Sequence, residues 1–223
     1  MKKLIVLFIT SLGFLSCTKG LRVDNIPMYG QPDIVRADIG IKADKEFINK
    51  VKNKLGDLNK ASSMWALQGD KYFSERNYDF AMRRYNQSWL LNPNNYQSYW
   101  GFGRVMMMFG DFEKSIEYFK TSLSLVNDDY QKVSLLADYG ASLSYAAKNH
   151  KDKLESSNLY NLAIIKFKES TVLDPEYGKA WRQWAFALYQ QKKYDESRKK
   201  LKIAKSLGEP YPMLDGWLKS KKK

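Results

Sequence analysis

Few residues of this chain could take part in covalent or metal chemistry. The 223 residues include one Cys and one His, which are Cys17 and His150. A single Cys excludes an internal disulfide, and one His without a second Cys excludes a metal site rich in His or Cys. His150 lies in a polar stretch and has no acidic partner at helical spacing. We therefore interpret it as a solvated loop histidine and not as a catalytic base.

Three consecutive methionines, Met106, Met107 and Met108, are the other group that could suggest a metal site. Consecutive residues of a helix point in different directions, and no Cys or His lies nearby to complete a set of ligands. Met106 falls on a core position, and we expect the other two to line a surface. The sequence also lacks a Gly-rich phosphate loop, a Ser nucleophile motif and a paired-carboxylate motif. We expect no metal, no cofactor and no enzymatic activity.

Cys17 stands at the end of an apolar run that follows a positively charged start. The run covers residues 4–14, which in a helix would span about half of the hydrocarbon core of a bilayer, so it is typical of a signal peptide and too short to cross a membrane. The residues Phe14-Leu15-Ser16-Cys17 resemble the lipobox of bacterial lipoproteins, although Phe14 and Leu15 are bulkier than usual. The resemblance implies a signal peptide over residues 1–16 and a lipid on Cys17.

The same resemblance predicts where the protein lies. Thr18 follows Cys17 where retention in the inner membrane usually requires Asp, so similarity to Gram-negative lipoproteins implies an outer-membrane lipoprotein that faces the periplasm. The alternative is an ordinary secreted protein with a free thiol. The formal net charge of +13 is diffuse along the chain and would suit a nucleic acid. An exported protein does not meet one, so we expect no nucleic-acid partner.

Beyond the signal sequence, the first two segments differ in their patterns. Residues 17–42 contain Gly and Pro without a helical period, and we expect a lipidated extended tether there. Residues 43–61 are amphipathic, with the apolar positions Phe47, Ile48, Val51, Leu55 and Leu58 on one face. A single amphipathic helix before a repeat array predicts a capping helix.

The rest of the chain repeats a pattern of small and large residues. Aromatic residues open the second helix of each predicted pair, and the spacing is 34 residues from Tyr78 to Phe112 (112 − 78) and again from Tyr160 to Tyr194 (194 − 160). Small residues recur at positions where two helices would touch. They are Gly69, Gly103, Gly140 and Ala185 in the first helices, and Ala81, Ser115, Ala163 and Ser197 in the second helices.

This pattern resembles the tetratricopeptide repeat (TPR) family over residues 62–211. The resemblance implies an all-α solenoid of about four helix-turn-helix repeats, which we expect at residues 62–95, 96–129, 133–177 and 178–211. The third repeat carries a polar insertion at residues 148–158, and we expect an exposed connection there. Residues 212–223 form a basic C-terminal end. We interpret it as a solubilising tail, with contact between its lysines and anionic lipid head groups as the alternative.

The resemblance also locates a binding surface, because the first helix of each TPR pair lines the concave face of the solenoid. Helical spacing places ten side chains on that face: Phe73, Trp100, Arg104, Met107, Met108, Tyr145, Lys179, Arg182, Phe186 and Tyr189. Aromatic residues, Met and Arg are enriched at protein-binding surfaces. The alternative is that several of these side chains contact neighbouring repeats instead.

These observations predict a membrane-anchored periplasmic scaffold that binds a protein or peptide in its groove. A narrower alternative is an assembly factor for an envelope machine, similar in layout to the pilotins of type IV pili or to the lipoprotein of outer-membrane protein assembly. This alternative rests only on the shared order of a lipobox followed by repeats. A cell-wall-associated protein is a further alternative, but residues 18–61 and 212–223 are too short for a separate carbohydrate-binding or catalytic domain.

Overall fold

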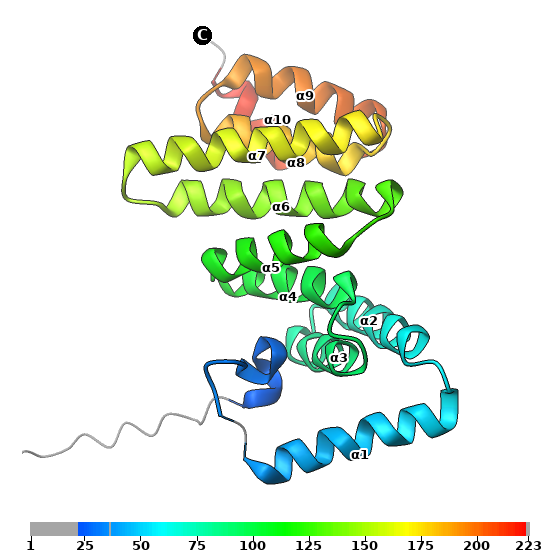
Figure 1. The fold of residues 1–223 in the computed structure, drawn as a ribbon. Coiled ribbons are helices and arrows are strands. Elements are labelled where there is room, and N and C mark those ends of the chain that lie inside the picture. Colours follow the sequence, from blue (N-terminus) through cyan, green and yellow to red (C-terminus); the bar gives the residue numbers. More distant parts are fainter. Residues whose placement is uncertain (1–21, 36, 222–223) are drawn as a thin grey trace, which may run out of the picture.

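The computed structural model describes residues 22–35 and 37–221, and within these ranges it contains helices and no strand (Figure 1). Two short 3₁₀ helices, η1 (Val23–Asn25) and η2 (Pro27–Gly30), come first. They are followed by α1 (Asp38–Leu55), α2 (Leu58–Ser74), α3 (Tyr78–Leu91), α4 (Tyr96–Phe109), α5 (Phe112–Leu125), α6 (Asp129–Asn149), α7 (Lys153–Leu173), α8 (Gly178–Gln190), α9 (Tyr194–Ser206) and α10 (Pro212–Lys219).

Helices α2 to α9 form four antiparallel pairs, α2–α3, α4–α5, α6–α7 and α8–α9, and the pairs stack one on another along the chain (Figure 1). Side-chain caps define where many of these helices begin, because the first backbone N–H groups of a helix have no partner within it. Asp57, Asn77, Asn95, Asp111, Asp128 and Asp152 each accept such a bond. The all-α repeat solenoid expected from the sequence is confirmed.

The small residues of the repeat pattern lie where two helices of a pair touch. A Cβ added at Gly103 would come within 3.0 Å of the Phe119 ring, and one added at Gly140 would come within 2.7 Å of the Phe167 ring. Both rings are fully buried. The glycines therefore let a large aromatic side chain of the second helix lie directly on the backbone of the first helix.

The expected extended tether over residues 17–42 needs correction in its described part. Residues 23–30 form η1 and η2, which pack against α3. The amide of Asn86, a fully buried residue of α3, donates to the backbone carbonyl of Asp24 at 3.0 Å, and the Arg83 guanidinium pairs with the Asp24 carboxylate at 3.2 Å. These contacts use backbone carbonyls and one ion pair. Because neither requires apolar residues at regular spacing, the sequence of residues 17–42 shows no helical period.

The bounds of the capping helix also differ from residues 43–61. Helix α1 already begins at Asp38 and ends at Leu55, because Gly56 follows with a φ of 74° that stops the helix. Asp57 then caps the new helix α2 by accepting N–H bonds from Asn59 and Lys60. Two helices therefore stand where the uninterrupted apolar spacing predicted one.

The residues of the insertion, 148–158, are almost all exposed as expected, but most of them are helical and do not form a long connection. Helices α6 and α7 are both 21 residues long and run antiparallel, and only residues 150–152 connect them. The Asp152 side chain caps α7 at the Glu155 N–H, and the Ser156 hydroxyl donates to the Ala147 carbonyl at 2.7 Å. The inserted residues extend both helices of the pair, because each added turn satisfies its own backbone groups.

The C-terminal end is also more ordered than a solubilising tail. Residues 212–219 form α10, whose Leu214 and Leu218 are buried in one cluster with Ala185 and Leu201. This helix covers the last repeat, which would otherwise expose the apolar faces of α8 and α9.

Three expectations concern residues outside the described ranges. The signal peptide over residues 1–16, the lipid on Cys17 and the first part of the tether all fall there. Within the described ranges, no helix is both long enough and apolar enough to cross a membrane.

Candidate protein-binding groove

A pocket of about 540 Å³ opens between the first helices of the last three repeats. It contains five of the side chains predicted for the groove: Met107 and Met108 from α4, Tyr145 from α6, and Arg182 and Phe186 from α8. The other lining residues are Phe112, Ala141, Ser144, Gln183 and Tyr211. We call this space the groove pocket. A volume of this size is typical of sites that enclose a small ligand or several side chains of a partner.

Aromatic rings form the walls of the groove pocket. Tyr145 stacks on Phe112, with ring centroids 6.0 Å apart and an interplanar angle of 11°, and its ring also lies 6.0 Å from Phe186. Phe186 in turn contacts Tyr211 at 5.8 Å. Met108 remains 48% exposed at the mouth. Rings held by one another give the site a fixed shape, whereas an unbranched Met side chain can adjust to the side chain that enters.

Arg182, the cation that lines the groove pocket, is paired. Its guanidinium lies 2.8 Å from the Glu209 carboxylate, and the two side chains are similarly exposed. The rim therefore combines a positive and a negative group without a large net charge.

Arg104 lies deeper in the concave face and does not line the groove pocket. Its guanidinium forms an ion pair with Asp70 and donates to the Tyr85 hydroxyl at 2.7 Å. It also lies over the rings of Phe73 and Trp100, 4.7 and 4.9 Å from their centroids. Burial raises the pKa of Tyr85 well above its usual range, so this hydroxyl keeps its proton at neutral pH. Arg104 and Phe73 therefore join the first two repeats.

Trp100 and Lys179 meet at a second buried carboxylate, that of Asp138 on α6. The Trp100 indole N–H donates to Asp138 Oδ2 at 3.1 Å, and Lys179 Nζ lies 2.9 Å from Asp138 Oδ1. Burial alone would raise the pKa of Asp138, but Lys179 and Arg104 hold it below its usual value. Asp138 in turn raises the pKa of Lys179. These interactions span α4, α6 and α8, and they occupy the polar groups of both predicted groove residues.

Tyr189 does not line the groove pocket. Its ring stacks on Trp217 at 5.6 Å and contacts Tyr194 at 5.6 Å. It lines a smaller hollow of about 350 Å³ together with Lys148 and Trp217. The ten predicted residues therefore divide into three groups: the groove pocket, the buried polar contacts around Asp70 and Asp138, and this outer hollow.

The residues that decide this division, Asp70, Asp138 and Tyr211, are not among those that the sequence pattern predicts for the groove. Asp138 lies within the otherwise apolar and small stretch of residues 135–144, and an acidic residue at such a position is a signal that could have identified it. Asp70 and Tyr211 carry no such signal. Among the described residues, no group of three or more His, Cys, Asp or Glu side chains could hold a metal ion.

Comparison of the sequence with known proteins finds relatives for only part of the chain. No family model matches the chain. A segment of 85 residues is 32% identical to the cell division cycle protein 16 homolog of Homo sapiens, and the same figures hold for the Mus musculus protein. The match covers 36% of this chain but only 14% of either relative, so the chain spans a small part of their length.

Solved structures extend the likeness over most of the chain. A thermophilic TPR protein of Thermus thermophilus superposes with a TM-score of 0.59 and 15% identity, over 66% of this chain and 74% of that one. MamA superposes with a TM-score of 0.50 and 17% identity, over 78% of this chain and 97% of that one. At these identities the likeness concerns the fold, and the fold is a TPR-type helical solenoid.

Proposed function

We propose that the protein is a non-enzymatic scaffold that binds a segment of a partner protein in the groove pocket. The observation that carries the proposal is the set of apolar side chains that this concave surface leaves uncovered, with Met107, Met108, Tyr145 and Phe186 around one space of about 540 Å³. Monomeric proteins rarely expose a joined apolar surface without a use for it. The TPR-type fold supplies a rigid frame for such a surface.

The lining of the groove pocket indicates which part of a partner it accepts. Aromatic walls favour a bulky apolar side chain, which is the kind of residue that contributes most to binding energy at interfaces. The Arg182–Glu209 pair at the rim already satisfies both charges. A partner segment that inserts an uncharged side chain would leave this pair intact, whereas a carboxylate would have to compete with Glu209 for Arg182.

The proposal extends to the place where the scaffold works. The lipobox-like residues before Cys17 support a lipid anchor, and Thr18 supports an outer-membrane protein whose body faces the periplasm. The partner is then a protein or peptide of the cell envelope. These steps rest on the sequence alone.

A random peptide library displayed on phage tests the binding proposal. We expect the full chain to enrich peptides that share a large apolar residue. The double variant Met108→Ala/Tyr145→Ala should lose about 2 kcal/mol or more of the binding energy of those peptides, as truncation of central interface residues does. Thermal melts check that the variant stays folded, because Tyr145, which packs on Phe112 and Phe186, also contributes to stability.

A matched control is the variant Leu162→Ala/Ile165→Ala, which removes two apolar side chains of similar exposure, 46% and 47%, from α7. It should bind the selected peptides as the wild type does. Equal loss in both double variants, or no enrichment at all, would reject the groove pocket as the binding site.

A further inference from the structure

The point where the chain enters the folded body is surrounded by exposed apolar side chains. The first described residues, Arg22 and Val23, line a hollow of about 440 Å³ together with Ile34, Val35 and Ile39. Val35 is 94% exposed and Ile39 is 81% exposed. We call Val23, Ile34, Val35 and Ile39 the entry patch. Nothing in the described residues covers it, although most other large apolar side chains of the N-terminal helices pack against a neighbour.

The length of chain before this patch limits how far it can lie from an anchor at Cys17. Five residue steps separate Cys17 from Arg22 (22 − 17), and a chain of that length reaches at most about 18 Å in any conformation. A tether to residue 42, as the sequence suggested, would have 25 steps (42 − 17) and a reach of about 90 Å. Because η1, η2 and α1 take up the residues after Arg22, that longer reach does not exist.

We propose that the entry patch rests on the lipid surface and that the solenoid stands on this end. The inference depends on the proposed lipid anchor at Cys17. An anchor within about 18 Å holds the patch next to the bilayer, and burial of Val35 and Ile39 among the acyl-chain ends removes their apolar surface from water. The anchor and the patch act on the same end of the molecule.

The charges around the entry patch favour apolar contact over attraction to anionic lipids. Arg22 pairs with Asp24 at 2.9 Å, and the exposed side chains of Asp33, Asp38 and Lys42 add charges of both signs. Among the described residues, such a mixture produces no strong field toward a charged surface. The contact should therefore form equally on neutral and on anionic membranes.

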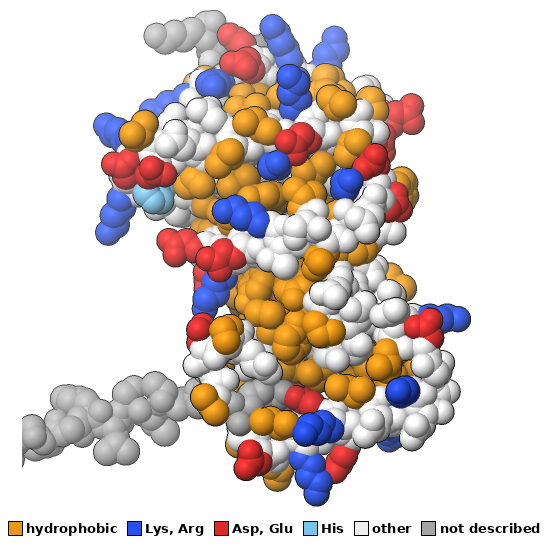
Figure 2. All heavy atoms as spheres, viewed as in Figure 1, with side chains coloured by type: hydrophobic (Ala, Val, Ile, Leu, Met, Phe, Trp, Pro, Cys, Tyr) orange, Lys and Arg blue, Asp and Glu red, His pale blue; other side chains and the backbone are white. Residues whose placement is uncertain are grey.

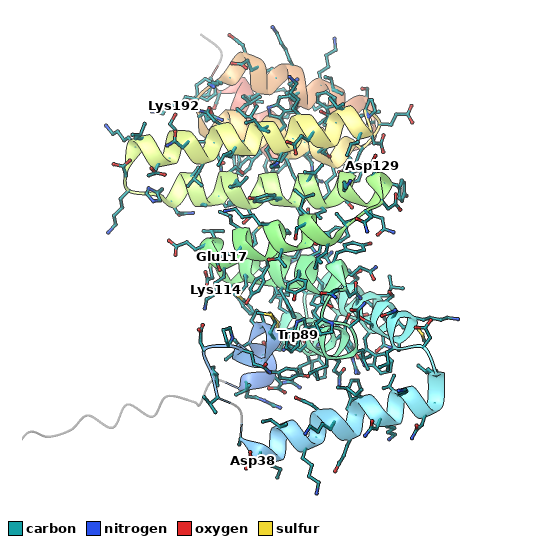
Figure 3. The ribbon with its side chains drawn as sticks, viewed as in Figure 1. Asp38, Trp89, Lys114, Glu117, Asp129 and Lys192 are labelled. Atoms are coloured by element: carbon teal, nitrogen blue, oxygen red, sulfur yellow. The ribbon has the colours of Figure 1, made fainter. Side chains whose placement is uncertain are left out.

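In this orientation the described lysines of the C-terminal end, Lys219 and Lys221, lie away from the lipid surface. Figure 3 labels Asp38 at the start of α1 and Lys192 near the opposite end of the stack, and Figure 1 places α9 and α10 at that far end. Basic side chains project from this far end in Figure 2. With the entry patch on the bilayer, the basic far end of the solenoid faces away from it.

Fluorescence of a label at single positions tests the proposal. The full chain is produced in a Gram-negative host, extracted, and reconstituted into vesicles of phosphatidylcholine with or without phosphatidylglycerol. The variants Ile39→Cys, Asn49→Cys and Lys202→Cys are each labelled with an environment-sensitive nitrobenzoxadiazole dye; all three positions are exposed. An acylated Cys17 does not react, so one dye per chain verifies the anchor.

We expect the dye at Ile39→Cys to shift its emission to the blue and to lose most of its intensity to nitroxide lipids on both kinds of vesicle. The dyes at Asn49→Cys, farther along α1, and at Lys202→Cys should keep the emission that they show in water.

Flotation with one dye per chain but a water-like signal at Ile39→Cys would overturn the inference and leave the anchor intact. Quenching at Lys202→Cys would overturn it in favour of the opposite end. Two dyes per chain without flotation would overturn the anchor, and the inference with it.

Discussion

Asp138 is the residue whose environment differs most from what its type suggests. It is nearly fully buried, yet it stays ionised because Lys179 Nζ and the Trp100 indole N–H both bind its carboxylate. Removal of one partner from a buried pair is costly because the remaining charge is left without compensation. Lys179 is about one-third exposed, so water can solvate it better than it can solvate Asp138. The two positions should therefore respond unequally to substitution.

Lys179→Met should destabilise the protein more than Asp138→Asn. We expect a loss of about 3 kcal/mol for the first, which leaves a buried carboxylate alone, and less for the second, where solvent screens the lysine. Urea unfolding of both single variants and of the double variant measures this. If Asp138→Asn proves the more damaging change, the negative charge of Asp138 is needed mainly to compensate Lys179 and Arg104, since the amide oxygen of Asn can still accept from Trp100.

The stability that Asp138 contributes should depend on pH in a defined direction. Its pKa is lower in the folded chain than the value of about 3.9 in an unfolded one, so the contribution is fully present above about pH 4. It is lost as the pH falls through the lower, folded pKa. The difference in unfolding free energy between the wild type and Asp138→Asn should hold constant from about pH 7 to about pH 5 and shrink below about pH 4. A difference that grows on acidification would contradict this account.

Close contact between the two helices of each pair stabilises the solenoid, and α10 covers its last repeat. The serine hydroxyls at the small positions add to this, since Ser115 donates to the Gly103 carbonyl at 2.8 Å and Ser197 donates to the Ala185 carbonyl at 2.7 Å. The two pairs use the same spacing of 12 residues. A polar residue at a helix contact is therefore tolerated where its hydroxyl finds a backbone acceptor.

Gly140→Ala should destabilise the α6–α7 pair by about 1–3 kcal/mol, because the new methyl group would overlap the buried Phe167 ring. The matched control is Gly216→Ala in α10, where nothing lies within 4 Å of the added Cβ. The control should be stabilising by up to about 1 kcal/mol, since Ala is the better helix former. Thermal melts of both variants measure the contrast, and equal melting temperatures would contradict the contact at Gly140.

Helix α10 should contribute to stability as part of the core. Leu214→Ala removes a fully buried side chain, and we expect it to cost about 2–5 kcal/mol. Its neighbour Met213 is 60% exposed, so Met213→Ala should cost little. Denaturant unfolding that shows no loss for Leu214→Ala would mean that residues 212–219 behave as the tail expected from their charge.

In the whole molecule, the groove pocket and the entry patch lie toward opposite ends of the solenoid. The groove pocket lies in the C-terminal half of the solenoid, between α4, α6 and α8, while the entry patch lies at the end formed by η1, η2 and α1 (Figure 1). An anchor at the N-terminal end would present the groove pocket away from the membrane surface. A partner could then reach it without displacing the lipid contact.

Cys17→Ser should abolish the processed, lipid-anchored form of the full chain. Apolar contact through the entry patch alone is small, and stable anchoring needs the additional acyl chains. We expect the variant to appear as an uncleaved precursor or in the soluble fraction after cell fractionation. A correctly processed variant that still floats with membranes would reject the lipid anchor.

Spacing along the chain is enough to establish the repeat and the contacts within each helical pair. The repeat places Gly103 against the helix of Ser115 and Ala185 against the helix of Ser197, because each of these contacts joins residues 12 apart. Spacing also identifies the apolar half of the groove pocket, since Met107, Met108 and Tyr145 follow from it once the concave helices are known.

Which of the predicted groove residues remain free depends instead on how the repeats pack. Trp100 and Asp138 are 38 residues apart, and Arg104 and Asp70 are 34 apart, so each contact joins two different repeats. The docking of residues 23–30 on α3 likewise rests on the amide of Asn86, a residue 60 positions from Ile26. A periodic pattern records which face of a helix is apolar. It does not record which polar group of another repeat will meet that face, because that depends on the angle and register at which the helical pairs stack.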